Sequence, residues 1–272
     1  MAADRTIPAW DTHVHAFGPE DRYPVQAVRG YDPPATDIAE YRSEASRVGL
    51  GRCVLVQPSI YGADNRALLD ALDASGGRDR GVVAPDPDWS RADLQALHER
   101  GVRGLRLNLL SAGGNGLASL RGHVGALRDL GWHVAAFLDA TAPGVLPQVL
   151  DALPVPVVLD HLGKPPRGLA DPSDPRFTVL LRAMAERRVW VKLSAPYQAS
   201  GRSWPWEDVA PFARALVRAA PDRVLFASNW PHVGAADAPG LGALAGTARD
   251  WIHAAGVDPQ QVFNENPAAL YA

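Results

Sequence analysis

Two histidines stand near the N-terminus, at the end of an apolar run that is typical of a strand. They are His13 and His15, in the segment IPAWDTHVHAFGP. Alternate residues of a strand lie on one face, so both imidazoles are expected to point the same way. Imidazoles accept protons, donate hydrogen bonds to a developing negative charge and bind metal ions. The pair therefore predicts a reactive site at the end of this strand.

Polar residues also follow the other apolar runs, which packing alone does not explain. His161 follows one run, Arg106 lies in another and Asn229 follows the last. We predict that His13, His15, His161 and Asn229 form the catalytic centre. The predicted substrate-binding residues are Gln57, Tyr61, Arg106, Lys164, Tyr197, Arg202 and His232. The remaining histidines are predicted to be structural: His98, His123, His133 and His253.

Short apolar runs alternate with amphipathic segments along the whole chain. The runs are Pro8–His13, Cys53–Gln57, Gly81–Ala84, Gly104–Leu107, His133–Leu138, Val155–Asp160, Val189–Leu193 and Arg223–Ala227. Their continuous apolar character is typical of parallel strands buried on both faces. Apolar residues recur at helical spacing in Arg91–Arg100, Phe177–Arg187 and Val209–Ala220. Eight strands alternating with helices predict one domain over residues 1–272, a (β/α)8 TIM barrel.

A doubly wound open sheet is the alternative fold. No Gly-x-Gly-x-x-Gly follows the first run, which disfavours it. Asp37 and Ser90 are predicted helix N-caps, and Gly101 and Gly131 are predicted to follow helix ends. Long aromatic-containing connections, 17–36 and 195–208, are predicted to form a lid or a wall of the site, because such loops gather at one end of a barrel.

Composition limits the classes of partner. The net charge of −3 argues against a broad nucleic-acid surface. The single cysteine, Cys53, lies in an apolar run and is predicted to be a buried thiol. No long apolar segment predicts a membrane span or a secretion signal, so the expected location is the cytoplasm. The predicted partner is a small molecule, and the oligomeric state is not predicted.

The chain resembles a known family. The motifs DTHVHAFGP, GVRGLRLN, VVLDHLGKP, VWVKLS, RVLFASNWPH and NPAALY occur in the order found in the amidohydrolase superfamily. They look most like the branch that contains 2-pyrone-4,6-dicarboxylate lactonase. The resemblance implies a site at the C-terminal ends of the strands and a carboxylated lactone as substrate. It also implies that His13, His15 and His161 polarise the lactone carbonyl, and that an Asp general base is expected where Asn229 stands.

No cofactor is predicted. A binuclear amidohydrolase centre needs a bridging Lys or Glu, further histidines and a final Asp, whereas this chain offers Arg106, Asp139 and Asn229 at the corresponding positions. The lactonase branch is regarded as metal-independent, which agrees. A single metal ion held by His13, His15 and His161 remains the alternative.

Binding of a carboxylate requires fixed cations. Arg106 is the leading candidate, followed by Arg202, Lys164 and Lys192. The segment after Arg106, NLLSAGGNG, is small and neutral, whereas the lactonase has further basic residues there. A less charged or more hydroxylated lactone than the pyrone dicarboxylate would suit this loop better.

Asn229 leaves three interpretations open. The first, which we favour, is lactone hydrolysis with a histidine of the trio or Asp160 as the base; in one form of it, Asn229 replaces a natural Asp by engineering. The second is isomerisation of a sugar-acid lactone, as in galactarolactone isomerase, in which a hydroxyl of the substrate attacks its own carbonyl. The third is a catalytically silent barrel that binds an acidic metabolite.

Overall fold

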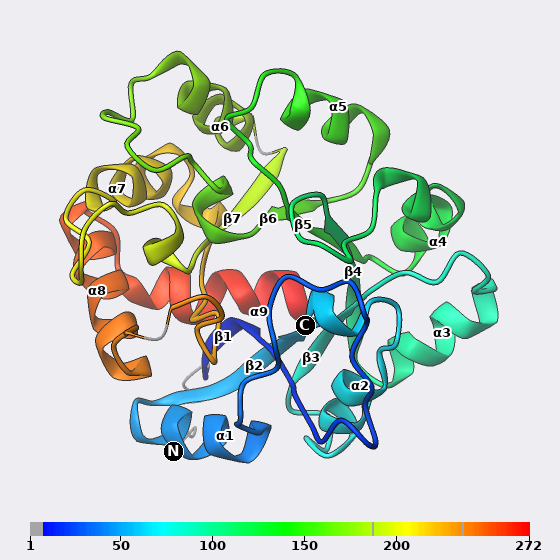
Figure 1. The fold of residues 1–272 in the computed structure, drawn as a ribbon. Coiled ribbons are helices and arrows are strands. Elements are labelled where there is room, and N and C mark those ends of the chain that lie inside the picture. Colours follow the sequence, from blue (N-terminus) through cyan, green and yellow to red (C-terminus); the bar gives the residue numbers. More distant parts are fainter. Residues whose placement is uncertain (1–7, 187, 236) are drawn as a thin grey trace, which may run out of the picture.

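Eight parallel strands follow one another in chain order around one sheet in the computed structural model, which describes residues 8–186, 188–235 and 237–272 (Figure 1). The strands are β1 (Ala9–Val14), β2 (Leu50–Val56), β3 (Arg80–Val83), β4 (Val102–Asn108), β5 (His133–Phe137), β6 (Val157–Leu159), β7 (Val189–Leu193) and β8 (Val224–Phe226). Each predicted run overlaps one of them, so the predicted barrel is confirmed. The run predicted from Val155 begins as a strand only at Val157, because Pro156 has no N–H to donate to a neighbouring strand.

Helices surround this sheet (Figure 1). They are α1 (Ile38–Arg47), α2 (Arg66–Asp73), α3 (Arg91–Glu99), α4 (Val124–Asp129), α5 (Val145–Ala152), α6 (Pro175–Ala185), α7 (Ala210–Ala219), α8 (Leu241–Ala254) and α9 (Asn266–Tyr271). The predicted helices correspond to α3, α6 and α7, although Arg187 lies outside the described residues. In the ranges that the structure describes, no helix is both long and apolar enough to cross a membrane.

The predicted helix ends are also confirmed. The Asp37 side chain accepts hydrogen bonds from the first turn of α1, and Ser90 forms a reciprocal capping box with Asp93 at the start of α3. Gly101 and Gly131 follow helices with φ of 100° and 67°, a region that side-chain-bearing residues rarely adopt. These local signals fix where α1 and α3 begin and where α3 and α4 end.

The sheet closes where β1 meets the segment after β8. The His15 N–H donates to the Trp230 carbonyl at 3.0 Å, and the Asn229 N–H donates to the His13 carbonyl at 3.0 Å. The buried Asp11 carboxylate strengthens this join, because its Oδ1 accepts the His13 N–H at 3.2 Å and the Ser228 N–H at 2.9 Å. The join thus brings two predicted site segments together.

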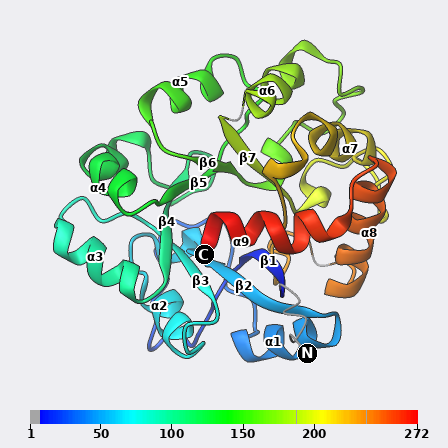
Figure 2. The same ribbon diagram turned by 180° about the vertical axis from the view of Figure 1, so that it is seen from behind.

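The two ends of the barrel are covered differently. Helix α9 lies across one end (Figure 2), where Tyr271 stacks on Trp10 of β1 and meets the edge of His133 at the start of β5. The strands therefore begin at this end. At the opposite end, the long loop after β1 crosses over β2 and β3 (Figure 1). That end carries the C-termini of the strands, where barrel enzymes have their sites.

Asp11 yields a prediction about stability. Burial raises the pKa of Asp11 to about 6, although hydrogen bonds from Ser228 and others oppose the rise. The folded protein then holds a proton that the unfolded chain releases near its ordinary pKa of 3.8. The bound proton therefore adds about 3 kcal/mol to the free energy of unfolding below about pH 3.8. This gain is lost as the pH rises through about 6.

The variant Asp11→Asn keeps an oxygen for both N–H donors and cannot titrate. We expect it to gain stability relative to the unsubstituted protein, by about 3 kcal/mol at most, between about pH 4 and about pH 7. Urea unfolding of both proteins at the two pH values measures this difference. A stability gap that does not change with pH would contradict the assignment. Asp11→Ala, which strands both N–H groups, should destabilise the fold by about 2–5 kcal/mol.

Candidate active site

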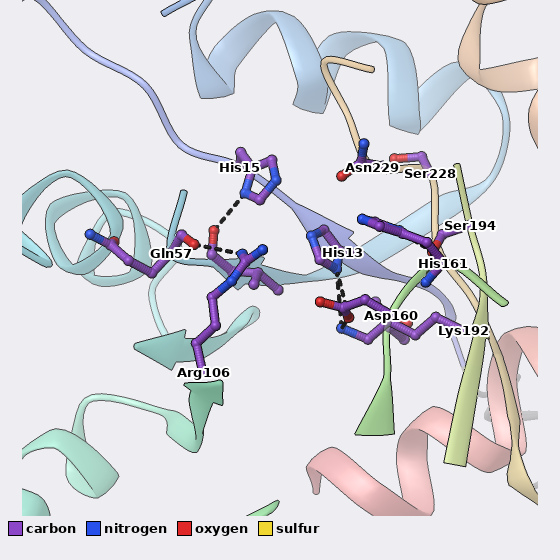
Figure 3. Close-up of polar contacts among 12 residues, drawn as sticks. His13, His15, Gln57, Arg106, Asp160, His161, Lys192, Ser194, Ser228 and Asn229 are labelled. Carbon is purple, nitrogen blue, oxygen red and sulfur yellow. Dashed lines mark hydrogen bonds and ion pairs between the residues drawn. The ribbon is translucent and has the colours of Figure 1, made fainter. Parts of the chain in front are cut away.

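Three buried imidazoles meet at the C-terminal end of the barrel (Figure 3). His13 lies on β1, His15 directly follows it, and His161 follows β6. The ring centres of His13 and His15 are 4.9 Å apart, and those of His13 and His161 are 5.0 Å apart. The sequence-based grouping of the three histidines is therefore found in the structure.

His161 is oriented by a serine of the next strand. Its backbone N–H donates to Ser194 Oγ at 3.1 Å, and its Nδ1 lies 2.8 Å from the same oxygen. Since Ser194 already accepts the backbone N–H, its own proton is best used toward Nδ1, which leaves the proton of His161 on Nε2. Burial lowers the pKa of His161 to about 3, so the ring is neutral near pH 7. It can then donate a hydrogen bond from Nε2.

His15 has the opposite proton arrangement. Its Nδ1 lies 2.8 Å from the Val56 carbonyl, which can only accept, so the proton is on Nδ1 and Nε2 carries a free lone pair. Burial, with the Arg106 charge adding to it, lowers the pKa of His15 to about 3. His15 is therefore a neutral acceptor near pH 7.

His13 is held by a buried ion pair. Asp160 Oδ1 lies 3.1 Å from His13 Nδ1 and 3.0 Å from Lys192 Nζ, and Lys192 Nζ lies 3.2 Å from His13 Nδ1. Burial alone would raise the pKa of Asp160, but Lys192 and His13 lower it well below its ordinary value. Because Lys192 can direct its protons to Asp160 Oδ1, the ionised carboxylate is free to attract the His13 proton to Nδ1. Nε2 of His13, which has no hydrogen-bond partner among the described residues, then carries the lone pair.

Arg106 supplies a positive charge beside the trio. Its side chain is buried and donates from Nη1 to the Gln57 carbonyl at 2.6 Å (Figure 3). Within the described ranges, no Asp or Glu forms an ion pair with it. Arg106 is therefore not part of a structural salt bridge among these residues. Its uncompensated charge instead suits an anionic group of a ligand.

Asn229 follows β8 with a φ of 59°, a left-handed conformation that Asn tolerates better than most residues. Its Nδ2 donates to the Tyr197 hydroxyl at 2.7 Å. Burial raises the pKa of that hydroxyl, which therefore stays protonated. The structure thus brings Tyr197 and Asn229 together beside His13. An amide at this position cannot take a proton from water.

The other predicted substrate-binding residues have different surroundings. The Gln57 amide donates to the carbonyls of Gly62 and Asp64, and His232 Nδ1 lies 3.3 Å from the Ser228 carbonyl. Tyr61 accepts a hydrogen bond from the Gly18 N–H and packs against Phe17. These contacts hold the loops that surround the site.

Two predicted cations lie farther out. Lys164 Nζ reaches the Gln198 carbonyl at 3.5 Å, although its charge still acts on His161. The Arg202 side chain is 67% exposed and faces Glu207 at 3.9 Å. The substrate-binding roles of Lys164 and Arg202 remain predictions.

The residues that orient the histidines were not predicted in that role, although Asp160 was considered as a base. Asp160 and Ser194 each set the orientation of a ring, and Lys192, a candidate carboxylate ligand in the sequence, is paired with Asp160. A lysine inside the apolar strand VWVKL needs a buried carboxylate partner. Asp160, which precedes His161 in the sequence, could have been predicted as that partner. Tyr31, whose hydroxyl interacts with Ser59 and with the Arg106 charge, had no such signal within its loop.

Positive charge surrounds the histidine trio, which disfavours a metal ion there. In the part of the chain that the structure describes, no three His, Cys, Asp or Glu side chains are grouped so as to hold a metal ion. Two cations, Lys192 and Arg106, act on the histidines and would repel a metal dication.

The chain is similar to known proteins in sequence and in fold. Residues 10–272 match the family described as Amidohydrolase. The chain is 37% identical to the 2-pyrone-4,6-dicarboxylate hydrolase of Comamonas testosteroni, over 82% of this chain and 77% of that protein. It is 33% identical to the 4-sulfomuconolactone hydrolase of Hydrogenophaga intermedia, over 97% and 88%. It is 28% identical to the D-galactarolactone isomerase of Agrobacterium fabrum, over 97% and 90%.

A solved apo structure from Agrobacterium tumefaciens superposes on this fold with a TM-score of 0.84 at 28% identity, covering 99% of this chain and 98% of that one. The resemblance inferred from the motifs is confirmed by a family match that spans nearly the whole chain. The protein therefore belongs to the amidohydrolase family.

Proposed function

We propose that this protein hydrolyses a lactone that carries an anionic group, at the C-terminal end of the barrel and without a metal ion. One observation carries the proposal: three neutral imidazoles converge with Nε2 free, protonated in His161 and unprotonated in His13 and His15, beside a buried arginine that has no carboxylate partner among the described residues. Relatives of this chain that act on lactones support the substrate class. A cytoplasmic location is part of the same proposal.

The ester carbonyl is bound by hydrogen-bond donors. His161 offers the Nε2 proton to the carbonyl oxygen, where negative charge develops as the tetrahedral intermediate forms. Arg106 binds the anionic group and orients the ring. Because both side chains are buried, water competes weakly with these contacts.

The missing carboxylate base is replaced by a histidine that a carboxylate supports. His13 Nε2 takes a proton from the attacking water, and Asp160 stabilises the imidazolium that forms. The water oxygen bonds to the carbonyl carbon, the ring C–O bond breaks, and the departing ring oxygen receives the proton from His13. The product is an open-chain hydroxy acid.

Isomerisation is the second candidate, and Asn229 is the observation that favours it. The amide bonded to Tyr197 is not a base for water, whereas a hydroxyl of the substrate is already close to the carbonyl that it attacks. His13 would then serve that hydroxyl. A similar chain that acts as an isomerase supports this alternative.

Proton release separates the two reactions. The purified protein is mixed with a panel of sugar-acid and pyrone lactones, and both the pH change and the ring signals in NMR spectra are followed. Hydrolysis should release one proton per turnover near pH 7, because the product is an ionised acid. Ring exchange without proton release would instead establish isomerisation. The control, His161→Ala, should lose at least about 100-fold in rate under either reaction, and full activity of this variant would contradict the site.

The role of Asn229 is tested by Asn229→Asp. A carboxylate there would share general-base work with His13, so hydrolysis should rise by about tenfold or more. Asn229→Ala, which also removes the amide but adds no base, is the matched control and should show no rise. If Asn229→Asp hydrolyses no faster, the amide is not what limits hydrolysis.

The pKa values predict the pH dependence. His15 and His161, with pKa values lowered to about 3 by burial, stay neutral through the weakly acidic range. The value of kcat/KM should therefore be flat from about pH 5 to about pH 8 and fall only below about pH 4. Initial rates at low substrate across this range provide the measurement. A limb with an apparent pKa near 6.5 would show that an ordinary, solvated histidine is required.

A further inference from the structure

A cavity of about 350 Å³ lies at the end of the barrel where the strands begin, which is the end opposite the histidine trio. Its walls come from α1, from the start of β2 and from the turn before β3. The volume is in the range of small-molecule pockets in proteins. None of the described residues that line the cavity takes part in the reaction proposed for the active site. The cavity is therefore a candidate for a second ligand site.

Three arginines line the cavity from different elements: Arg42 from α1, Arg52 from β2 and Arg78 from the turn before β3. Of the described residues that line it, only Asp79 is acidic. Arg42 Nη2 lies 3.2 Å from Asp79 Oδ2, and Arg78 Nε lies 3.5 Å from Asp79 Oδ1. One carboxylate thus serves two guanidinium groups. Three arginines and one carboxylate leave a net charge of +2 at the cavity.

Arg52 is held in place without an ion pair to any described residue. Its Nε donates to the Arg78 carbonyl at 2.6 Å, and its guanidinium carbon lies 4.0 Å from the centre of the Trp10 ring. Burial lowers the pKa of Arg52, and the nearby Arg80 charge adds to this effect. A carbonyl and a ring therefore fix the direction of this guanidinium, while its charge remains available to an anion.

The arginines also have free donors that a ligand can reach. Nη1 and Nη2 of Arg52 have no hydrogen-bond partner among the described residues, yet they are not enclosed by protein. The same two atoms of Arg78 have no partner in the described ranges either, and this side chain is 48% exposed. The Nε of Arg42, in contrast, is fully buried and is not available to a ligand. Two guanidinium groups thus present free N–H groups at one wall.

A phosphate monoester matches this charge better than a carboxylate does. It carries about −1.5 to −2 near pH 7 and accepts hydrogen bonds on three oxygens, whereas a carboxylate carries a single charge on two oxygens. Arginine binds phosphate oxygens in pairs, which suits two guanidinium groups at one wall. The wall also includes the apolar side chains of Ala45 and Leu50. The cavity therefore has room for a small organic group attached to the phosphate.

We propose that this cavity binds the phosphate monoester of a small molecule, as a second site at the end of the barrel where the strands begin. The phosphate oxygens accept hydrogen bonds from Arg52 and Arg78, and Arg42 adds its charge from α1. The organic group lies against Ala45 and Leu50. The proposal does not depend on the lactone chemistry, because it uses no residue of the active site.

Calorimetric titration at pH 7 with phenyl phosphate, inorganic phosphate and benzoate tests the site. The unsubstituted protein should bind phenyl phosphate with a Kd at least about fivefold lower than that for inorganic phosphate, which lacks the organic group. Benzoate has the ring but only one negative charge. Its Kd should be at least about tenfold higher than that of phenyl phosphate.

Two variants and two controls assign the binding to this cavity. Arg78→Gln removes one guanidinium and should raise the Kd for phenyl phosphate at least about tenfold. The side chain of Arg78 is half-exposed and its contact with Asp79 is long, so this variant should fold. Arg52→Gln should raise the Kd as well. Arg128→Gln, an exposed change on α4 that removes the same charge, and Arg106→Gln, in the active site, should leave this Kd unchanged.

The outcomes keep this site apart from the active site. No binding of phenyl phosphate, or a Kd that neither Arg78→Gln nor Arg52→Gln raises, would overturn the proposal. A Kd that Arg106→Gln raises instead would place the phosphate beside the histidines and would overturn it too. Equal Kd values for phenyl phosphate and inorganic phosphate would overturn the ester, and equal values for phenyl phosphate and benzoate would overturn the phosphate. Lactone turnover enters none of these comparisons, so failure of the lactone chemistry would leave this site standing.

Discussion

The join between β1 and the segment after β8 is the constraint on which the site depends. Few backbone hydrogen bonds cross it, and the Asp11 carboxylate supplies two more acceptor contacts there. The Asn229 N–H donates to the His13 carbonyl, so a hydrogen bond that closes the barrel also fixes the relative positions of two site residues. A buried carboxylate at this join trades some stability near neutral pH for a fixed position of the first catalytic strand.

The charged side chains inside the barrel differ in how they are paired. The Asp160–Lys192 pair is buried, and its two charges offset one another, so it acts on His13 by local orientation. Arg106, by contrast, has no acidic partner in the described ranges and offers its field to a ligand. Burial keeps the histidines neutral, which allows two of them to carry free lone pairs while the third carries a proton toward the substrate. One chemical group thus takes different roles because its neighbours differ.

The sequence was sufficient for the fold and for the histidine trio. The signals used were local: continuous apolar runs, helix caps such as Ser90 and the His13–His15 spacing. Each depends on neighbouring residues in the chain, so it indicates the same element before and after the barrel closes. The partners of the trio were harder to predict. Ser194 and Asp160 act across strands, and their distances depend on the register between β6 and β7. The position of Tyr31 depends on the path of a long loop, which no periodicity encodes. Lys164 and Arg202 lie farther from the trio than predicted. The sequence identifies their charge but not the direction in which each side chain points.

The loop 109–116 is built on two asparagines at its base. Asn108 caps its first turn, while the Asn115 side chain accepts from the Asn108 N–H and donates to the Arg106 carbonyl. The shape of the loop is therefore set largely by hydrogen bonds between its own two ends. Such a segment can diverge between relatives, or be grafted from one to another, while the histidines stay in place. Substrate choice and bond cleavage are in this way separable traits, open to independent change during evolution.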